Sequence, residues 1–89
     1  MELKITDKPE HKRYQMKLDG NWALAHYRDR DGVRYIEHVE VAPAIQHRGA
    51  ASALMRGIVN DAKERGINLV PVCSYAVAWL QRHPNILDA

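Results

Sequence analysis

The stretch Val41-Ala-Pro-Ala-Ile-Gln-His-Arg-Gly-Ala-Ala51 decides how this chain folds, because the hydrophobic pattern changes its period there. Before it, apolar and polar residues alternate, as in half-buried strands; after it, apolar residues recur at helical spacing. Pro43 stops the strand, and the small residues Gly49 to Ala51 open the helix. A helix start carries unpaired N–H groups and partial positive charge, so this loop is a natural seat for a phosphate.

Three strands are expected upstream of this loop. Asp19-Gly20 and Arg30-Asp31-Gly32 are turn signals, because Gly accepts the positive φ angles of a tight hairpin. The strands are expected over residues 13–18, 21–28 and 33–42, and tight turns between them favour antiparallel pairing.

A helix, a strand and a second helix are expected downstream. The long helix runs from Gly49 to Arg65, and Gly66 lies where a helix C-terminus favours positive φ. A buried strand over 67–72 follows, and then a helix from Ser74, its expected N-cap, to about Gln81. The order β-β-β-α-β-α predicts an α+β fold in which the strands flanking the long helix lie parallel.

The bulk composition bounds the function classes. The chain has 89 residues, enough for one domain over 1–89, and a net charge of +2, which is too weak to indicate nucleic acid or membrane binding. Its single cysteine, Cys73, excludes an internal disulfide, and no histidine spacing indicates a metal. The N-terminus has no apolar segment of signal-peptide length. We expect a cytoplasmic protein, a monomer or weak homodimer, without a metal.

Gln46-x-x-Gly49-x-Ala51 matches the Q/R-x-x-G-x-G/A signature of the GNAT superfamily of N-acetyltransferases. From roughly Lys4 to its C-terminus, the chain also resembles the short single-domain, CG-type subfamily. The matching segments are His38-Val39-Glu40-Val41, Pro71-Val72-Cys73-Ser74-Tyr75 and Arg82-His83-Pro84. The resemblance implies a minimal GNAT fold with a splayed parallel strand pair. It also implies an acetyl-CoA-dependent N-acetyltransferase whose amine acceptor, a protein, peptide or small molecule, is unidentified.

The resemblance further implies where the coenzyme lies. Its pantetheine arm would occupy a wedge between Glu40–Ala42 and Pro71–Cys73, with the acyl thioester close to His38 and Cys73. The implied coenzyme-binding residues are Val41, Gln46, His47, Arg48, Gly49, Ala50, Ala51, Ser52 and Tyr75. Considered alone, however, the loop has a second explanation, since Gly49 and the alanines would also allow close packing of the helix on the sheet.

Two mechanisms fit the candidate catalytic residues Cys73, His38 and Glu40. In one, a base on the strand (His38, Glu40 or Glu37) takes a proton from the amine, which attacks the thioester directly. In the other, Cys73 carries the acetyl group, with its thiolate favoured by the following helix start and His38 accepting its proton. Strand alternation places Glu37 and Glu40 on opposite faces, so at most one should reach the site. Cys73 could instead be a small buried hydrophobe, and His38 could simply face water.

The chain departs from the family pattern at three positions. Leu80 stands where many GNAT enzymes have a tyrosine acid, Cys73 where an asparagine is common, and Val39 where the subfamily has threonine. The missing tyrosine leaves an alternative open, a non-catalytic acyl-CoA-binding or sensing module. The strands that wall the acceptor side in larger GNAT enzymes are also missing, which would suit a protein or peptide amine.

Overall fold

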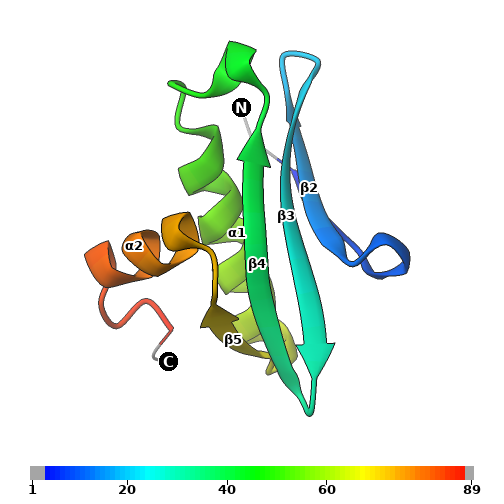
Figure 1. Cartoon of the computed structure of the whole chain (residues 1–89), viewed down its shortest axis with the longest axis vertical. Coiled ribbons are helices and arrows are strands. Elements are labelled where there is room, and N and C mark those ends of the chain that lie inside the picture. The colour runs from blue at the N-terminus through cyan, green and yellow to red at the C-terminus, as the bar shows by residue number, and fades with distance from the viewer. Residues whose placement is uncertain (1–3, 88–89) are drawn as a thin grey trace.

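The structure, a computed structural model, describes residues 4–87, which form one five-stranded sheet and two α-helices (Figure 1). The strand order follows the sequence, and all neighbours are antiparallel except β4 and β5, which are parallel. This confirms the expected α+β architecture with its strand–helix–strand crossover. The strands are β1 (Ile5–Lys8), β2 (Arg13–Leu18), β3 (Asn21–Arg30), β4 (Val33–Val41) and β5 (Asn68–Pro71). The helices are α1 (Ala50–Arg65) and α2 (Ser74–Arg82), with 3-10 turns η1 (Pro9–His11) and η2 (Pro43–Ile45).

The structure adds one strand, β1, to those expected from the sequence. It pairs with β2 from Ile5↔Met16 to Lys8↔Arg13, and its four residues are too few to show an alternation of their own. Its side chain at Ile5 lies against α1, where a Cβ added at Gly57 would collide with Ile5 Cδ1. A glycine inside the helix therefore makes room for the edge strand.

Element ends differ from the expected ones by one or two residues. β3 extends to Arg30, β4 stops at Val41, and β5 covers only Asn68–Pro71. α1 begins at Ala50, because Gly49 has φ of 77° and is the residue before the helix rather than part of it. The expected Ser74 cap is wrong: Cys73 is the N-cap of α2, and Ser74 is its first helical residue.

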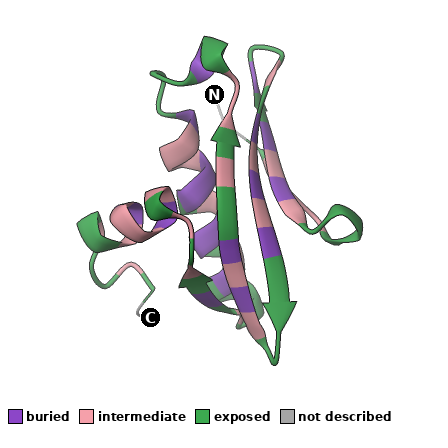
Figure 2. Ribbon diagram, viewed as in Figure 1, coloured by how far each residue is buried: buried purple, intermediate pink, exposed green. Residues whose placement is uncertain are grey.

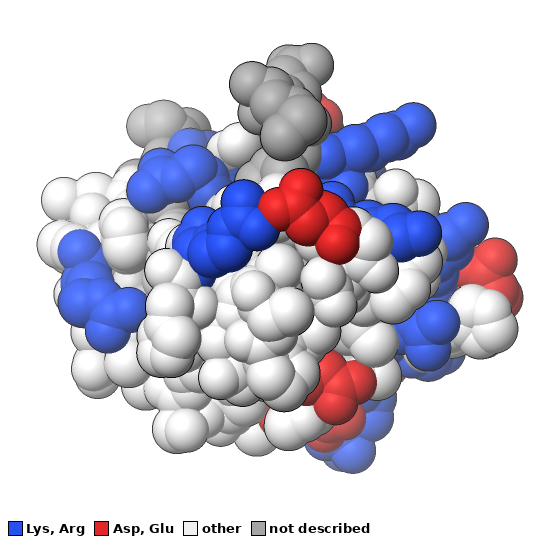
Figure 3. Space-filling model, turned by 90° about the horizontal axis from the view of Figure 1, so that it is seen from above, with Lys and Arg blue, Asp and Glu red and all other residues white. Residues whose placement is uncertain are grey.

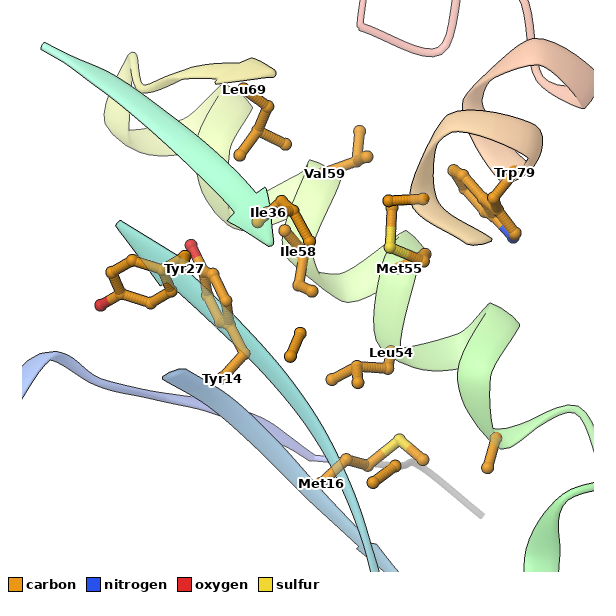
Figure 4. Packing of buried hydrophobic residues seen from close by; sticks show 14 of the residues in the cluster. Tyr14, Met16, Tyr27, Ile36, Leu54, Met55, Ile58, Val59, Leu69 and Trp79 are labelled. Atoms are coloured by element: carbon orange, nitrogen blue, oxygen red, sulfur yellow. The ribbon is translucent and has the colours of Figure 1, made fainter. Parts of the chain in front are cut away.

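The core lies between α1 and one face of the sheet (Figure 4). The helix contributes four large side chains with no exposed area: Leu54, Met55, Ile58 and Val59. The strands β2 and β3 bury every second residue against it. α2 packs beside α1 through Trp79, which is also fully buried. Neither helix covers the opposite face of the sheet, which carries mostly exposed and half-buried residues (Figures 1 and 2).

A buried guanidinium ties the strands together at the C-terminal end of α1. Arg34 on β4, only 5% exposed, donates to both carboxylate oxygens of Asp29 at 2.7 and 2.9 Å and to Asp7 on β1 at 3.2 Å. It also donates to the Tyr14 hydroxyl at 2.8 Å and lies over the Tyr27 ring at 3.9 Å. A charge buried this deeply is tolerated because its donors are paired.

The two carboxylates of this cluster are held in their ionised form. The hydrogen bond from Arg34 is the main cause that lowers the pKa of Asp29. Burial alone would raise the pKa of Asp7, but hydrogen bonds from Tyr27 and Arg65 and the charge of Arg34 outweigh it and lower that pKa as well. Both groups therefore stabilise the fold only while they are ionised.

Replacing Arg34 with Met should lower the free energy of unfolding by about 3–5 kcal/mol, because it leaves Asp7 and Asp29 without their buried partner. Urea unfolding at pH 6 measures this. Arg30→Met is the matched control: Arg30 has a side chain 72% exposed and pairs only loosely with Asp31 at 3.9 Å, so it should cost no more than about 0.5 kcal/mol.

Urea unfolding repeated at acid pH tests how much the Asp7 and Asp29 carboxylates contribute to the free energy of unfolding. Since their folded-state pKa values lie below the unfolded value of about 3.9, their contribution is complete above that pH and is lost as the pH falls through the folded-state values. The parent should thus lose stability below about pH 4 more steeply than Arg34→Met. Equal slopes would contradict the pairing of Arg34 with these two groups.

Candidate functional site

The parallel pairing of β4 with β5 ends after four residue pairs. Their parallel register runs from Val33↔Asn68 to Ile36↔Pro71 and then stops. The Ile36 carbonyl oxygen accepts both of the next two amides, Val72 N at 2.9 Å and Cys73 N at 3.1 Å. One acceptor taking two successive donors turns the chain out of the sheet and into α2. The wedge therefore opens directly after Ile36, and Pro71, expected on its wall, still pairs with β4.

In the part of the chain that the structure describes, one edge of β4 has no neighbouring strand beyond Ile36. The Ala42 amide donates to Trp22 O of β3 at 3.0 Å, so by antiparallel alternation the N–H and C=O groups of residues 40 and 42 point toward β3. Those of Val39 and Val41 point the other way, into the wedge. The Val41 carbonyl is within 3.5 Å of Gln46 Nε2, the one side-chain contact recorded on this edge within residues 4–87. This edge can pair with an extended ligand that carries amide groups.

A bulge in β4 decides which side chains face which way. The register with β3 shifts from His26↔His38 to Tyr27↔Ile36, which leaves Glu37 as the extra residue. Glu37 reaches Arg28 at 3.4 Å on the uncovered face, the same face as Glu40. The expectation that Glu37 and Glu40 lie on opposite faces is therefore wrong, because simple alternation does not survive an inserted residue.

On that face, three ionisable side chains form a cluster. Glu40 bridges two imidazoles, with Oε1 at 3.0 Å from His26 Nε2 and Oε2 at 3.5 Å from His38 Nε2. The two rings stack with centroids 6.0 Å apart. The hydrogen bond from His26 is the main cause that lowers the pKa of Glu40. Sequence reasoning missed His26, since only the register of β3 against β4 brings it beside Glu40.

Cys73 lies half-buried at the start of α2. Its Sγ accepts the Ala76 amide at 3.4 Å, so the sulfur takes the place of the usual capping oxygen. His38 pairs with Glu40 rather than with Cys73. Within residues 4–87, the structure records no hydrogen bond between His38 and Cys73. Tyr75 follows in the first turn of α2, where burial raises the pKa of its phenol and keeps it protonated.

The loop before α1 has an open approach. A Cβ added at Gly49 would meet nothing within 4 Å, so close packing does not explain this glycine; its φ of 77° does. Ala50 is fully buried, and the packing explanation therefore holds for it. No side chain of residues 4–87 caps α1, and its first-turn amides are left to an outside acceptor.

Side chains around the loop have partners of their own. Arg48, expected at the rim, forms an ion pair with Asp19 of the β2–β3 turn. Ser52 Oγ accepts Trp79 Nε1 at 2.9 Å and thereby joins the two helices. Seen from this end of the molecule, Lys and Arg are spread around a largely uncharged area rather than gathered (Figure 3).

Other surface features lie apart from this end. A hollow of about 400 Å³ is found at the far end of α1, lined by residues that include Ala62, Gly66 and Leu87. Within residues 4–87, no three His, Cys, Asp or Glu side chains gather as ligands for a metal ion. Nor is any helix there long and apolar enough to cross a bilayer.

A crossover that leaves a parallel strand pair splayed beside a helix start is consistent with the minimal N-acetyltransferase-type fold that the sequence resemblance implies. Comparison with protein families agrees. Residues 13–89 match the family described as GCN5-related N-acetyl-transferase, and the chain belongs to that family. The matched segment begins at β2 and leaves out β1. A comparison with curated proteins found no match.

Cys73 should contribute to stability as a helix cap, apart from any chemistry. Cys73→Ala removes the acceptor of the Ala76 amide and should cost about 1 kcal/mol, whereas Cys73→Ser keeps an acceptor and should stay within about 0.5 kcal/mol of the parent. Urea unfolding of the three proteins compares them. Equal stability of Cys73→Ala and the parent would show that the sulfur does not cap α2.

Proposed function

We propose that this chain transfers the acetyl group of acetyl-CoA to an amine, with the coenzyme lying along the wedge and across the start of α1. The supporting observation is that the free β4 edge at Val39 and Val41 leads to the uncapped turn after Gly49. Pantetheine carries amides that pair with such an edge, and a pyrophosphate accepts the hydrogen bonds that a helix start offers. Val41, Gln46, His47, Arg48, Ala50, Ala51, Ser52 and Tyr75 complete the proposed coenzyme contacts.

In the proposed reaction, His38 is the general base and the amine attacks directly. The amine nitrogen forms a bond to the thioester carbon, and the bond from that carbon to sulfur breaks. The amine proton passes to His38, and the coenzyme A thiolate takes a proton from Tyr75 or water. Glu40 is a poor base because its pKa is lowered; as a carboxylate it instead orients His38. Transfer through Cys73 is the competing route, in which the sulfur first takes the acetyl group.

Leu80 supports a second candidate function, coenzyme binding without turnover. Its side chain packs against the core and cannot donate a proton, although it occupies the position of a proton donor in related enzymes. In such a sensing module the coenzyme site would be the same and the transfer would be absent. Turnover with any amine excludes this candidate.

The setting of the activity is part of the same proposal. The one cysteine is unpaired, which suits a reducing compartment such as the cytoplasm. We propose a single domain over residues 1–89 that works as a monomer or weak homodimer, with acetyl-CoA and an amine as its partners.

Gly49→Asp should weaken acetyl-CoA binding tenfold or more, because it places a negative charge beside the pyrophosphate. Gly49→Asn is the matched control: it has nearly the same size and also tolerates positive φ, so binding should stay within about threefold of the parent. Calorimetric titration measures both. Loss of binding in both variants would point to strain at this position instead of charge, and no binding by the parent would end the proposal.

His38→Gln should lower kcat about 100-fold or more while leaving acetyl-CoA affinity unchanged, because it removes the base and not the coenzyme contacts. Cys73→Ser should keep most of the turnover. Thiol release from acetyl-CoA in the presence of an amine panel measures both rates. A larger loss of kcat in Cys73→Ser than in His38→Gln, together with an acetyl group found on Cys73 by mass spectrometry, would establish the acyl-enzyme route instead.

A further inference from the structure

The uncovered face of the sheet is unevenly charged, and its β1–β2 half is basic. Tyr14, Met16 and Leu18 of β2 are buried toward α1, so the residues that alternate with them point to the uncovered face. The register of β1 against β2 arranges this half in cross-strand rows. The rows are Lys4 with Lys17, Thr6 with Gln15, and Lys8 with Arg13, and we call these six residues the basic face. The basic face holds four cations and no carboxylate, although the net charge of the whole chain is only +2.

The cations of the basic face are available to a ligand. Within residues 4–87, the structure records no ion pair for any of the four. Arg13 Nε donates to Gln15 Oε1 at 3.4 Å, which occupies the oxygen of Gln15 and leaves its N–H groups to an outside acceptor. Asp7 and Asp61 pair instead with Arg65, on the side of the sheet that α1 covers. The basic face can therefore offer charge-assisted hydrogen bonds to an anionic ligand.

Protection of the sheet edge explains only part of this pattern. Lysines on an edge strand keep other chains from pairing with it, and Lys4 and Lys8 lie along the β1 edge. Arg13 and Lys17 lie on β2, which is paired on both sides and needs no such protection. The cations of β2 therefore require another explanation.

An exposed indole borders the basic face. Trp22 of β3 lies directly opposite Lys17 and is 45% exposed. Lys17 Nζ lies 5.1 Å from the centroid of the indole ring. A hollow of about 330 Å³ joins this indole to the basic face, and its lining includes Lys4, Thr6, Gln15, Lys17 and Trp22. Proteins that hold single-stranded nucleic acid combine the same two features, cations for the phosphates and an aromatic ring on which a base stacks.

We propose that the basic face binds single-stranded nucleic acid, with a base stacked on Trp22. Lys4 and Lys8 are four residues apart along an extended strand, a span of about 13 Å, so successive phosphates of one strand lie within reach of the cations. The uncharged donors of Thr6 and Gln15 lie between the two rows of cations and can bind a phosphate there. This surface goes beyond the proposed transferase function and does not depend on it.

The indole decides between the anionic partners that four cations would attract. An acidic polypeptide could pair with the cations, but it has no planar group of its own that requires Trp22. Bases in a duplex are stacked on one another and leave no face for an indole, whereas every base of a single strand has a face that can stack. The partner that uses both the charge and the ring is therefore a single strand.

Fluorescence anisotropy with a labelled oligodeoxythymidine of about ten nucleotides tests this surface in the absence of acetyl-CoA. The parent should bind this probe in a saturable way. With four cations on phosphates, a plot of the logarithm of the binding constant against that of the salt concentration should have a slope of about −3. A duplex of the same length should bind more weakly, because its bases cannot stack on Trp22.

Variants separate the cations from the indole. Arg13→Gln/Lys17→Gln should weaken binding about tenfold or more near 50 mM salt and halve the slope, because two phosphate contacts are lost. Trp22→Leu should weaken binding about fivefold or more and leave the slope unchanged, because stacking releases no counterions. Arg56→Gln/Lys63→Gln is the matched control: it removes two exposed cations from α1, on the covered side of the sheet, and should bind like the parent.

Several outcomes would each overturn the inference. They are the absence of saturable binding, an equal loss in the α1 control, and parent-like binding by Trp22→Leu. Polyglutamate or phosphatidylserine vesicles that bind as tightly as the oligonucleotide would show that the surface attracts any anion. Excess acetyl-CoA should leave the oligonucleotide bound, and its displacement would mean that the basic face is part of the coenzyme site. Failure of acetyl-CoA to bind at all would end the proposed function and leave this surface standing.

Discussion

The carbonyl oxygen of Ile36 is the point on which the rest of this structure depends. By accepting both Val72 N and Cys73 N, it ends the parallel ladder and sends the chain into α2. On one side of this point the sheet is closed by β5; on the other, β4 keeps a free backbone edge beside the start of α1. In the proposed coenzyme site, backbone groups that would otherwise be unsatisfied supply the contacts, so that a small fold would need no large cavity.

The residues that stabilise the fold and those of the proposed coenzyme site lie at opposite ends of the molecule. Around the buried Arg34, ion pairs join β1, β3 and β4, and tyrosines from β2 and β3 complete the cluster. Around Gly49 and Cys73, helix starts, half-buried side chains and open approaches predominate. Such a division is physically reasonable, since groups that are fully paired within the protein have nothing left to offer a ligand.

Much of the fold was predictable from local pattern, and much of the site was not. Alternation, the Asp-Gly turns and the helical stripe of α1 are local signals, and they place β2, β3, β4 and α1 almost correctly. β1 has only four residues and depends on Ile5 meeting Gly57, a contact between distant segments. For the same reason, sequence reasoning missed His26 and the Arg34 cluster. The expectation for Glu37 failed because it assumed unbroken alternation, which the bulge at Glu37 interrupts.

The first strand has a consequence for domain boundaries. The family match begins at residue 13, yet Asp7 holds Arg34, and Ile5 fills the space above Gly57. The segment that is recognisable by descent is thus shorter than the segment that folds. An expression fragment trimmed to the recognisable part would leave one edge of β2 without its partner strand. It would also take from the buried Arg34 one of its two carboxylate partners. The failure of such a fragment to fold would say nothing about the chemistry of the family.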